Sequence, residues 1–190
     1  DLLLSGIGGA FVSGVTLLPG NVTARFTIAG ILTEGALTAD ILAGAVTDVF
    51  GNSGLSFNAT YQVDYGTFPF PAPVTSHAPL GSLIYSRTFT GLVNTAGDVD
   101  NFTLNIDSNQ TISVIVTPTA PGLQPRVQLL DPTSASLGIA SAGAAGQIAG
   151  MQTIPANLAG VYTFAISGVG STVGTYSLQV ILNSAFELEG

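Results

Sequence analysis

Apolar residues that recur at every second position are the feature that most constrains the fold of this chain. Four segments alternate with a period of two: residues 101–106, 110–116, 161–167 and 175–182. Because successive side chains of a β-strand point to opposite faces of a sheet, this period predicts half-buried strands. No segment sustains a 3.6-residue period, so we predict an all-β fold, with one short helical turn near residues 42–49.

The first 68 residues carry weaker strand patterns that turn residues separate. Two apolar-rich stretches, 12–18 and 22–29, flank the sequence Pro-Gly-Asn at 19–21, which predicts a hairpin. Two further strands are predicted at 37–42 and 55–63. The sequences at 2–6 and 32–54 resemble the C-terminal part of a bacterial immunoglobulin-like (Ig-like) domain.

This resemblance implies a partial sandwich. An Ig-like sandwich needs about seven strands, and only four or five fit into residues 1–68. We expect the missing strands to lie upstream in a longer polypeptide or to come from a neighbouring chain. An unfinished sandwich exposes a strand edge and part of its core, which is the physical basis of strand addition.

A proline-rich segment follows this first module. The sequence FPFPAPVTSHAP at 68–79 holds four prolines, which remove backbone donors and fix φ. We therefore predict an extended linker at 69–82, a second module at 83–183, and an acidic linker stub at 184–190.

Charged residues are scarce. They make up 7% of the chain, against about 25% in an ordinary soluble domain. The chain has no lysine, three arginines and a net charge of −8, which argues against binding to nucleic acid or to anionic lipid. No window reaches the roughly 18 unbroken apolar residues of a membrane-spanning helix, so we expect no membrane insertion. Cysteine is absent, which excludes a disulfide framework.

The second module resembles the bacterial pre-peptidase C-terminal (PPC) domain, a family related to the collagen-binding domains of collagenases. A Gly-Asp-x-Asp turn leads into an aromatic-bearing strand, and four further family segments follow in order. The matching segments are residues 97–102, 109–112, 127–131, 160–168 and 174–178. The resemblance implies a jelly-roll-like β-sandwich.

The same resemblance implies a calcium site at Asp98 and Asp100. Aspartates of this turn bind calcium in the collagen-binding relatives together with acidic linker residues, and Asn94 and Asn101 lie close by in this sequence. Calcium needs about six to eight oxygen ligands, whereas residues 68–82 contain no carboxylate. The alternative is that both aspartates cap a tight turn by accepting backbone hydrogen bonds.

Four aromatic residues near the predicted linker form a second candidate site: Tyr61, Tyr65, Phe68 and Phe70. Such a cluster could stack on a sugar. The alternative, which we favour, is that these side chains pack between the two modules.

Catalysis has little support in the sequence. The single histidine, His77, lies in the predicted linker, and no serine has a nucleophile-elbow motif around it. No pair of acids stands out as a glycosidase pair. We predict that the chain is not an enzyme.

Two functions are consistent with these features. The first is a structural module of a secreted or cell-surface protein, which assembles into a fibre or layer with copies of itself or with neighbouring repeats. The second is an accessory module that binds a polysaccharide or a collagen-like polymer for a secreted hydrolase. Both place the chain outside the cell.

Overall fold

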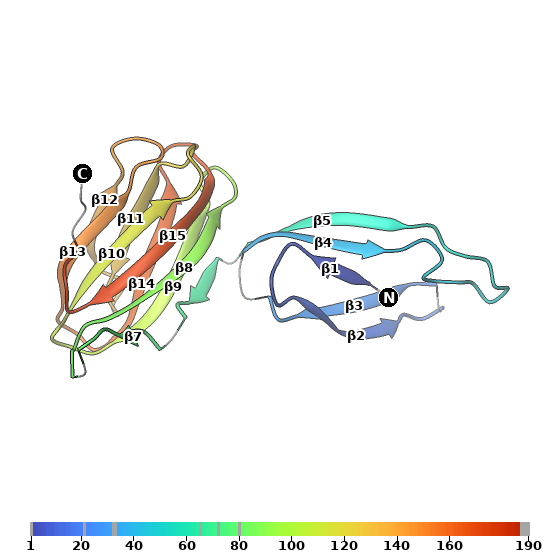
Figure 1. Cartoon of the computed structure of the whole chain (residues 1–190), viewed down its shortest axis with the longest axis horizontal. Helices are drawn as coiled ribbons and strands as arrows, with labels where there is room; N and C mark the ends of the chain where they lie inside the picture. The colour runs from blue at the N-terminus through green and yellow to red at the C-terminus, as the bar shows by residue number, and fades with distance from the viewer. Residues whose placement is uncertain are drawn as a thin grey trace. The chain divides into compact units, whose positions relative to one another are not determined.

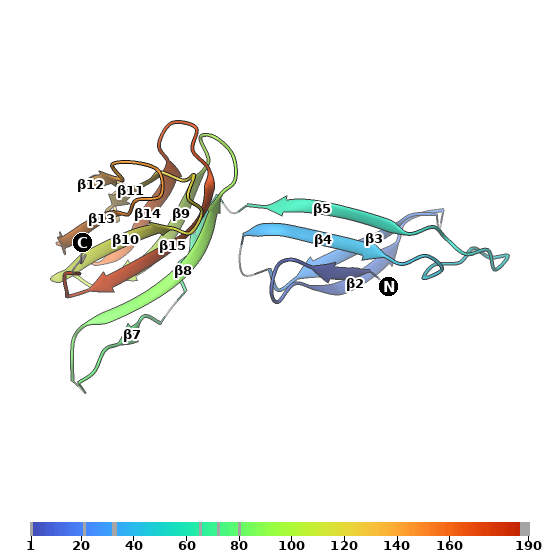
Figure 2. The ribbon, with the colours of Figure 1, turned by 45° about the horizontal axis from the view of Figure 1, so that its top comes forward.

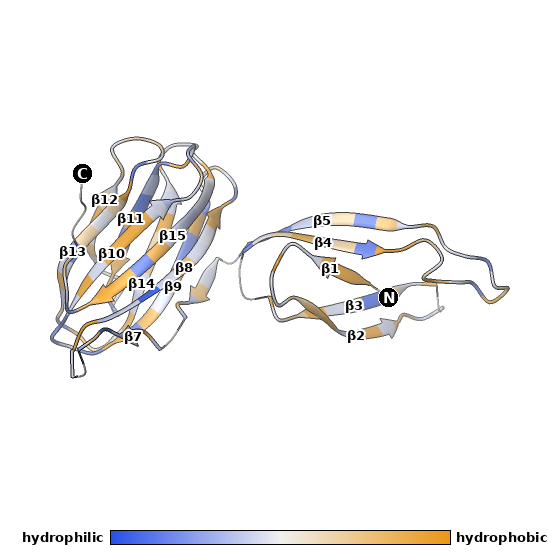
Figure 3. Ribbon diagram, in the orientation of Figure 1, coloured by the Kyte–Doolittle hydropathy of each residue, from blue (hydrophilic) through white to orange (hydrophobic). Residues whose placement is uncertain are grey.

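The computed structural model describes residues 2–20, 22–31, 34–64, 66–71, 73–79 and 81–186. These residues form strands, turns and bends but no helix, which confirms the predicted all-β fold. The chain divides into two compact units, Asp1–Asp64 (unit 1) and Tyr65–Gly190 (unit 2). Figure 3 shows hydrophobic and hydrophilic residues alternating along the strands of both units.

Unit 1 contains two small antiparallel sheets. A three-stranded sheet has the order β1-β4-β5, and a two-stranded sheet consists of β2 and β3. Their bounds are β1 Leu3–Ser5, β2 Phe11–Leu17, β3 Ala24–Ala29, β4 Gly35–Ile41 and β5 Phe57–Val63. The predicted hairpin is confirmed, because β2 pairs with β3 and the backbone N–H of Leu18 bonds to Thr23 across the turn. Figures 1 and 2 show the two sheets.

The predicted helical turn at 42–49 is wrong. The chain between β4 and β5 instead forms a β-bridged loop in which Thr47 pairs with Ser53. The carboxylate of Asp48 accepts hydrogen bonds from the backbone N–H groups of Phe50 and Asn52, at 2.9 and 2.8 Å. The Asp48 side chain satisfies these backbone N–H groups locally, which favours a turn over a helix at this position.

Unit 2 contains two five-stranded sheets with the orders β13-β10-β15-β8-β7 and β12-β11-β14-β9-β6. The first sheet consists of β7 Thr75–Ser76, β8 Tyr85–Val93, β10 Gln110–Pro118, β13 Ala149–Ala156 and β15 Gly174–Leu182. The second consists of β6 Thr67–Pro69, β9 Val99–Ile106, β11 Pro125–Leu130, β12 Ser136–Ser141 and β14 Gly160–Gly168. All neighbouring strands are antiparallel except β6 and β9, which run parallel.

The core of unit 2 lies between these sheets and comes from the predicted alternation. In β14, for example, Tyr162, Phe164 and Ile166 are buried while the residues between them are more exposed. β9 and β15 show the same period. Five of the largest fully buried side chains are aromatic: Phe70, Phe102, Tyr162, Phe164 and Tyr176.

The predicted linker at 69–82 is wrong, because this segment is part of unit 2. β6 ends at Pro69 and pairs with β9, and the N–H of Phe70 bonds to the carbonyl of Thr103. β7 pairs with β8 a few residues further on. Proline is compatible with the edge of a sheet, where its missing donor leaves no ladder bond unmade.

The predicted linker stub at 184–190 is also wrong for its first residues, whereas 187–190 lie outside the described residues. Ser113, fully buried in β10, donates a hydrogen bond of 2.6 Å to the carbonyl of Ser184. The ring of Phe186 lies against Gly150, at the distance where a Cβ atom would collide with it. Residues 184–186 therefore fold back onto the sheet.

Candidate functional site

An apolar cleft lies inside unit 1. Its volume is about 350 Å³. The lining residues come from β3, β4, β5 and the start of the chain, and none is charged: Leu2, Ala24, Phe26, Ile28, Ala39, Ile41, Phe57 and Tyr61. An uncharged cleft of this kind offers burial to apolar side chains and no anchor for an ionic ligand.

The described strands of unit 1 leave part of the inner faces of its two sheets uncovered. Tyr61 pairs with the buried Leu37, so the two side chains share the inner face of the three-stranded sheet. Even so, Tyr61 is 53% exposed and Phe57 is 47% exposed. In the other sheet, Val15 lies beside Phe26 and is largely exposed as well.

The two candidate calcium ligands have different partners. Asp98 accepts a hydrogen bond of 2.9 Å from the backbone N–H of Asn94, so it caps the turn before β9. Asp100 is 1% exposed and accepts a hydrogen bond of 2.5 Å from the hydroxyl of Tyr176. The side-chain oxygen of Asn94 is buried without a hydrogen-bond partner among the described residues. Calcium binding here stays a prediction.

Three of the four predicted aromatic residues lie among the described residues, and each has its own surroundings. Phe70 is 2% exposed and belongs to the core of unit 2, so it cannot stack on a ligand. Phe68 packs against the same core, with its ring 5.2 Å from that of Phe89. Tyr61 lines the cleft of unit 1, and Tyr65 lies outside the described residues. The sugar-stacking interpretation is therefore wrong for Phe70.

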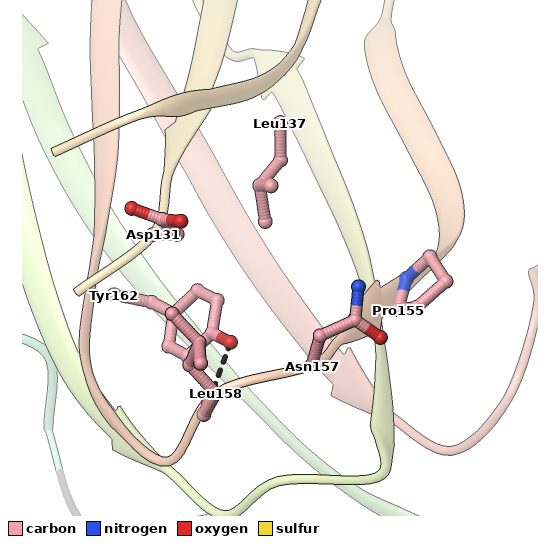
Figure 4. Close-up of a pocket in the computed structure, with 6 residues that line it drawn as sticks. All are labelled: Asp131, Leu137, Pro155, Asn157, Leu158 and Tyr162. Atoms are coloured by element: carbon pink, nitrogen blue, oxygen red, sulfur yellow. Dashed lines mark hydrogen bonds between the residues drawn. The ribbon is translucent and has the colours of Figure 1, made fainter. Parts of the chain in front are cut away.

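A smaller hollow lies near the end of β11 in unit 2 (Figure 4). Its volume is about 230 Å³, and its lining residues are Asp131, Leu137, Pro155, Asn157, Leu158 and Tyr162. The hydroxyl of Tyr162 donates a hydrogen bond of 2.7 Å to the carbonyl of Leu158. Asp131 is the one carboxylate among these residues, so the hollow lacks the acid pair of a glycosidase.

Asp131 is held in place by its own turn. One carboxylate oxygen accepts hydrogen bonds from the hydroxyl and N–H of Thr133 and from the N–H of Ala135. The hydroxyl of Thr133, followed by the N–H of Ala135, lowers the pKa of this carboxyl below its ordinary value. The polar side chains that line the hollow are those of Asp131, Asn157 and Tyr162.

His77 is exposed, and its side chain lies 2.6 Å from the hydroxyl of Ser86. Its backbone N–H bonds to the carbonyl of Ile84, which extends the contact between β7 and β8. Among the described residues, no carboxylate is hydrogen-bonded to His77 or Ser86. The described residues also contain no helix long and apolar enough to cross a membrane.

Neither the cleft nor the hollow was identified from the sequence. The cleft-lining residues alternate in β3, β4 and β5 as core residues do, so their pattern predicts burial. The one signal in the sequence was the small number of strands in residues 1–68. The hollow brings together residues of the strands β12, β13 and β14 and of the turns after β11 and β13, and no local sequence pattern marks such a set.

No family model matches the chain, and no curated protein matches it in sequence. Among solved structures, the chain is similar to β-rich domains. One is PliG of Aeromonas hydrophila, a periplasmic inhibitor of g-type lysozyme, at 14% identity and a TM-score of 0.38, covering 63% of this chain and 97% of PliG.

Another is the pre-peptidase C-terminal domain of collagenase from Bacillus anthracis. The identity is 22% and the TM-score 0.39, and the match covers 50% of this chain and 88% of that domain. A third, at 13% identity and a TM-score of 0.23, is a carbohydrate-binding module of the β-sandwich superfamily, with 90% of this chain and 82% of the module covered. All three TM-scores are below 0.5, so the function proposed below rests on the chain's own residues.

Proposed function

We propose that this chain is a non-catalytic structural module of a secreted or cell-surface protein. It assembles with copies of itself or with neighbouring repeats of the same polypeptide. The unfinished core of unit 1 is the observation that carries this proposal.

The two units differ sharply in how much apolar surface they bury. Of the 26 buried apolar side chains among the described residues, 23 belong to unit 2 and three to unit 1: Ile7, Leu37 and Ala39. Of the 19 large apolar side chains that are exposed, 12 belong to unit 1. A unit of about 60 residues is marginally stable even with a complete core. Burial of these side chains against another chain would stabilise unit 1.

Low charge supports the same function. Exposed strand edges are usually protected by charged side chains, especially lysine. This chain has no lysine, and 7% of its residues are charged. Exposed apolar surface with few charges around it is typical of interaction surfaces between proteins.

Sedimentation velocity and electron microscopy of the full chain test this proposal. A structural module forms ordered assemblies or oligomers whose size increases with protein concentration. A single species of the monomer mass, 19.1 kDa, at every concentration would contradict it.

A second function, binding of a polysaccharide or collagen-like polymer, has one observation in its favour. The hollow of unit 2 places an ionised carboxylate and an amide beside apolar side chains. Co-sedimentation of the chain with insoluble polysaccharides and with collagen tests it. Binding that is saturable and is lost in Asn157→Ala would support this second function over the first.

A further inference from the structure

The free edge of β5 differs from the other strand edges of unit 1. Within the described residues β5 pairs only with β4, so one side of its backbone has no neighbouring strand. Its seven residues, FNATYQV, contain no charge, proline or glycine, and its pairing with β4 has no bulge. Such an edge has none of the features that prevent strands from pairing between molecules.

The remaining edges of unit 1 are less suited to pairing. β1 has three residues. β2 carries a register shift between Val12 and Gly14, and a bulge of this kind bends and twists a strand. β3 carries the charged Arg25.

The aromatic side chains of β5 are also incompletely buried in the isolated chain. Phe57 and Tyr61 face the apolar cleft and are about half exposed. On the opposite face, Asn58 donates a hydrogen bond to Asp40, and Thr60 lies 3.2 Å from the hydroxyl of Thr38. The edge therefore presents apolar groups on one face and uncharged polar groups on the other.

We propose that two copies of this chain pair through β5 in antiparallel orientation, about a two-fold axis at Thr60. This inference rests on the proposed function and names the surface through which copies meet. A centre at Thr60 lets all seven residues of β5 overlap with the partner strand. The two three-stranded sheets then form one six-stranded sheet with both inner faces on the same side.

In this register, large side chains of one copy lie opposite smaller side chains of the other. Residues whose numbers add up to 120 lie opposite each other, so Tyr61 meets Ala59 of the second copy and Phe57 meets Val63. On the polar face Asn58 meets Gln62, and two amides can exchange hydrogen bonds. Each aromatic ring is thus opposite a smaller side chain, and the partner strand covers the cleft of the first copy.

The distribution of charge also favours contact between copies at the β5 edge. Copies that each carry a net charge of −8 repel one another, which favours contact where charge is absent. The nearest acid in the sequence, Asp64, lies opposite Ser56 in this register. The two Asp64 carboxylates are therefore at opposite ends of the paired strands.

Thr60→Lys tests this surface, since it places two like charges opposite each other at the axis. Thr60 is exposed, so the isolated chain can accommodate lysine. We expect the dimer dissociation constant from sedimentation equilibrium to rise at least about tenfold. Thr27→Lys is the matched control, because it adds the same charge to the exposed outer face of β3, away from the proposed surface. This control should dimerise as the parent does.

A single cysteine gives a second readout that does not depend on the charge. The chain has no cysteine of its own, so Thr60→Cys reports only on this position. Opposite residues of paired strands have Cβ atoms about 4.5–5.5 Å apart, so mild oxidation should cross-link the dimer through Thr60→Cys and not through Thr27→Cys.

The outcomes separate the surface from the function. The full chain could assemble while Thr60→Lys dimerises as tightly as Thr27→Lys and Thr60→Cys cross-links no more than Thr27→Cys. In that case the proposal that copies pair through β5 is wrong and the structural function stands. If the full chain remains monomeric at every concentration, both are wrong.

Discussion

The hydroxyl of Tyr176 donates a hydrogen bond of 2.5 Å to the carboxylate of Asp100 inside unit 2. Tyr176 belongs to β15 and Asp100 to β9, so the bond connects the two sheets of the sandwich. Both residues are almost completely buried, and Tyr176 belongs to the apolar core of unit 2. A polar link of this kind is costly to break, because the acid loses a partner in a place that water does not reach.

We predict that Tyr176→Phe destabilises unit 2 by about 1–3 kcal/mol, because it removes one hydrogen bond from a buried carboxyl group. Urea denaturation, followed through the NMR signals of buried unit 2 residues, measures this change. Tyr61→Phe is the matched control, since it removes the same atom from a half-exposed ring and should change stability by less than about 0.5 kcal/mol. Equal effects of the two variants would contradict the prediction.

Gly91 is expected to be intolerant of a side chain. It lies opposite Tyr176 in the pairing of β8 with β15, and a Cβ atom at this position would overlap the hydroxyl group of Tyr176. Gly91→Ala should therefore displace the ring and cost about 1–3 kcal/mol. Gly122→Ala, where a Cβ meets nothing within 4 Å, is the control. A Gly91→Ala variant as stable as the control would show that the ring is free to move.

Asp131 should make the turn after β11 sensitive to acid. Its pKa in the folded chain is lowered, first by the hydroxyl of Thr133, from the ordinary 3.8. The folded state thus favours the ionised form, so its stabilising contribution is complete above pH 3.8 and is lost as the pH falls through the lower, folded value. An NMR titration of the carboxyl carbon of Asp131 measures this, and a midpoint at or above 3.8 would contradict it.

The calcium prediction for Asp98 and Asp100 can be tested by titration calorimetry with calcium alone. A site at this turn predicts heat of binding in the parent chain that Asp100→Ala loses. Asp107→Ala, a change of the same kind at an exposed position, should keep the heat. The absence of heat in both the parent and Asp100→Ala would contradict the calcium prediction.

The strands of unit 2 were the part of the fold that the sequence predicted best. Alternation in 161–167 and 175–182 reflects burial between two complete sheets, so the period of the side chains and the structure agree. The prolines at 69–82 predicted a linker because local backbone chemistry opposes a central strand. Phe68 and Phe70 nevertheless pack into the core of unit 2 beside β9. This contact depends on a strand that is distant in the sequence, so local backbone chemistry does not predict it.

The candidate sites show the same limit. Asp98 caps its turn, as one of the two sequence-based alternatives held, because a capping bond involves residues four apart. The residues that line the cleft of unit 1 could not be named from the sequence, since Phe57 and Tyr61 alternate like core residues although both are about half exposed. Local patterns predict which face of a strand is apolar, but not whether anything covers it.

Assembly through unit 1 is the central claim, and hydrogen–deuterium exchange of the full chain at low and high concentration tests it most directly. Backbone amides exchange slowly when they are hydrogen-bonded and shielded from water. We predict that exchange in β5, Phe57–Val63, slows as concentration rises, while exchange in the complete core of unit 2 stays unchanged. Exchange in unit 1 that is the same at both concentrations would contradict the claim.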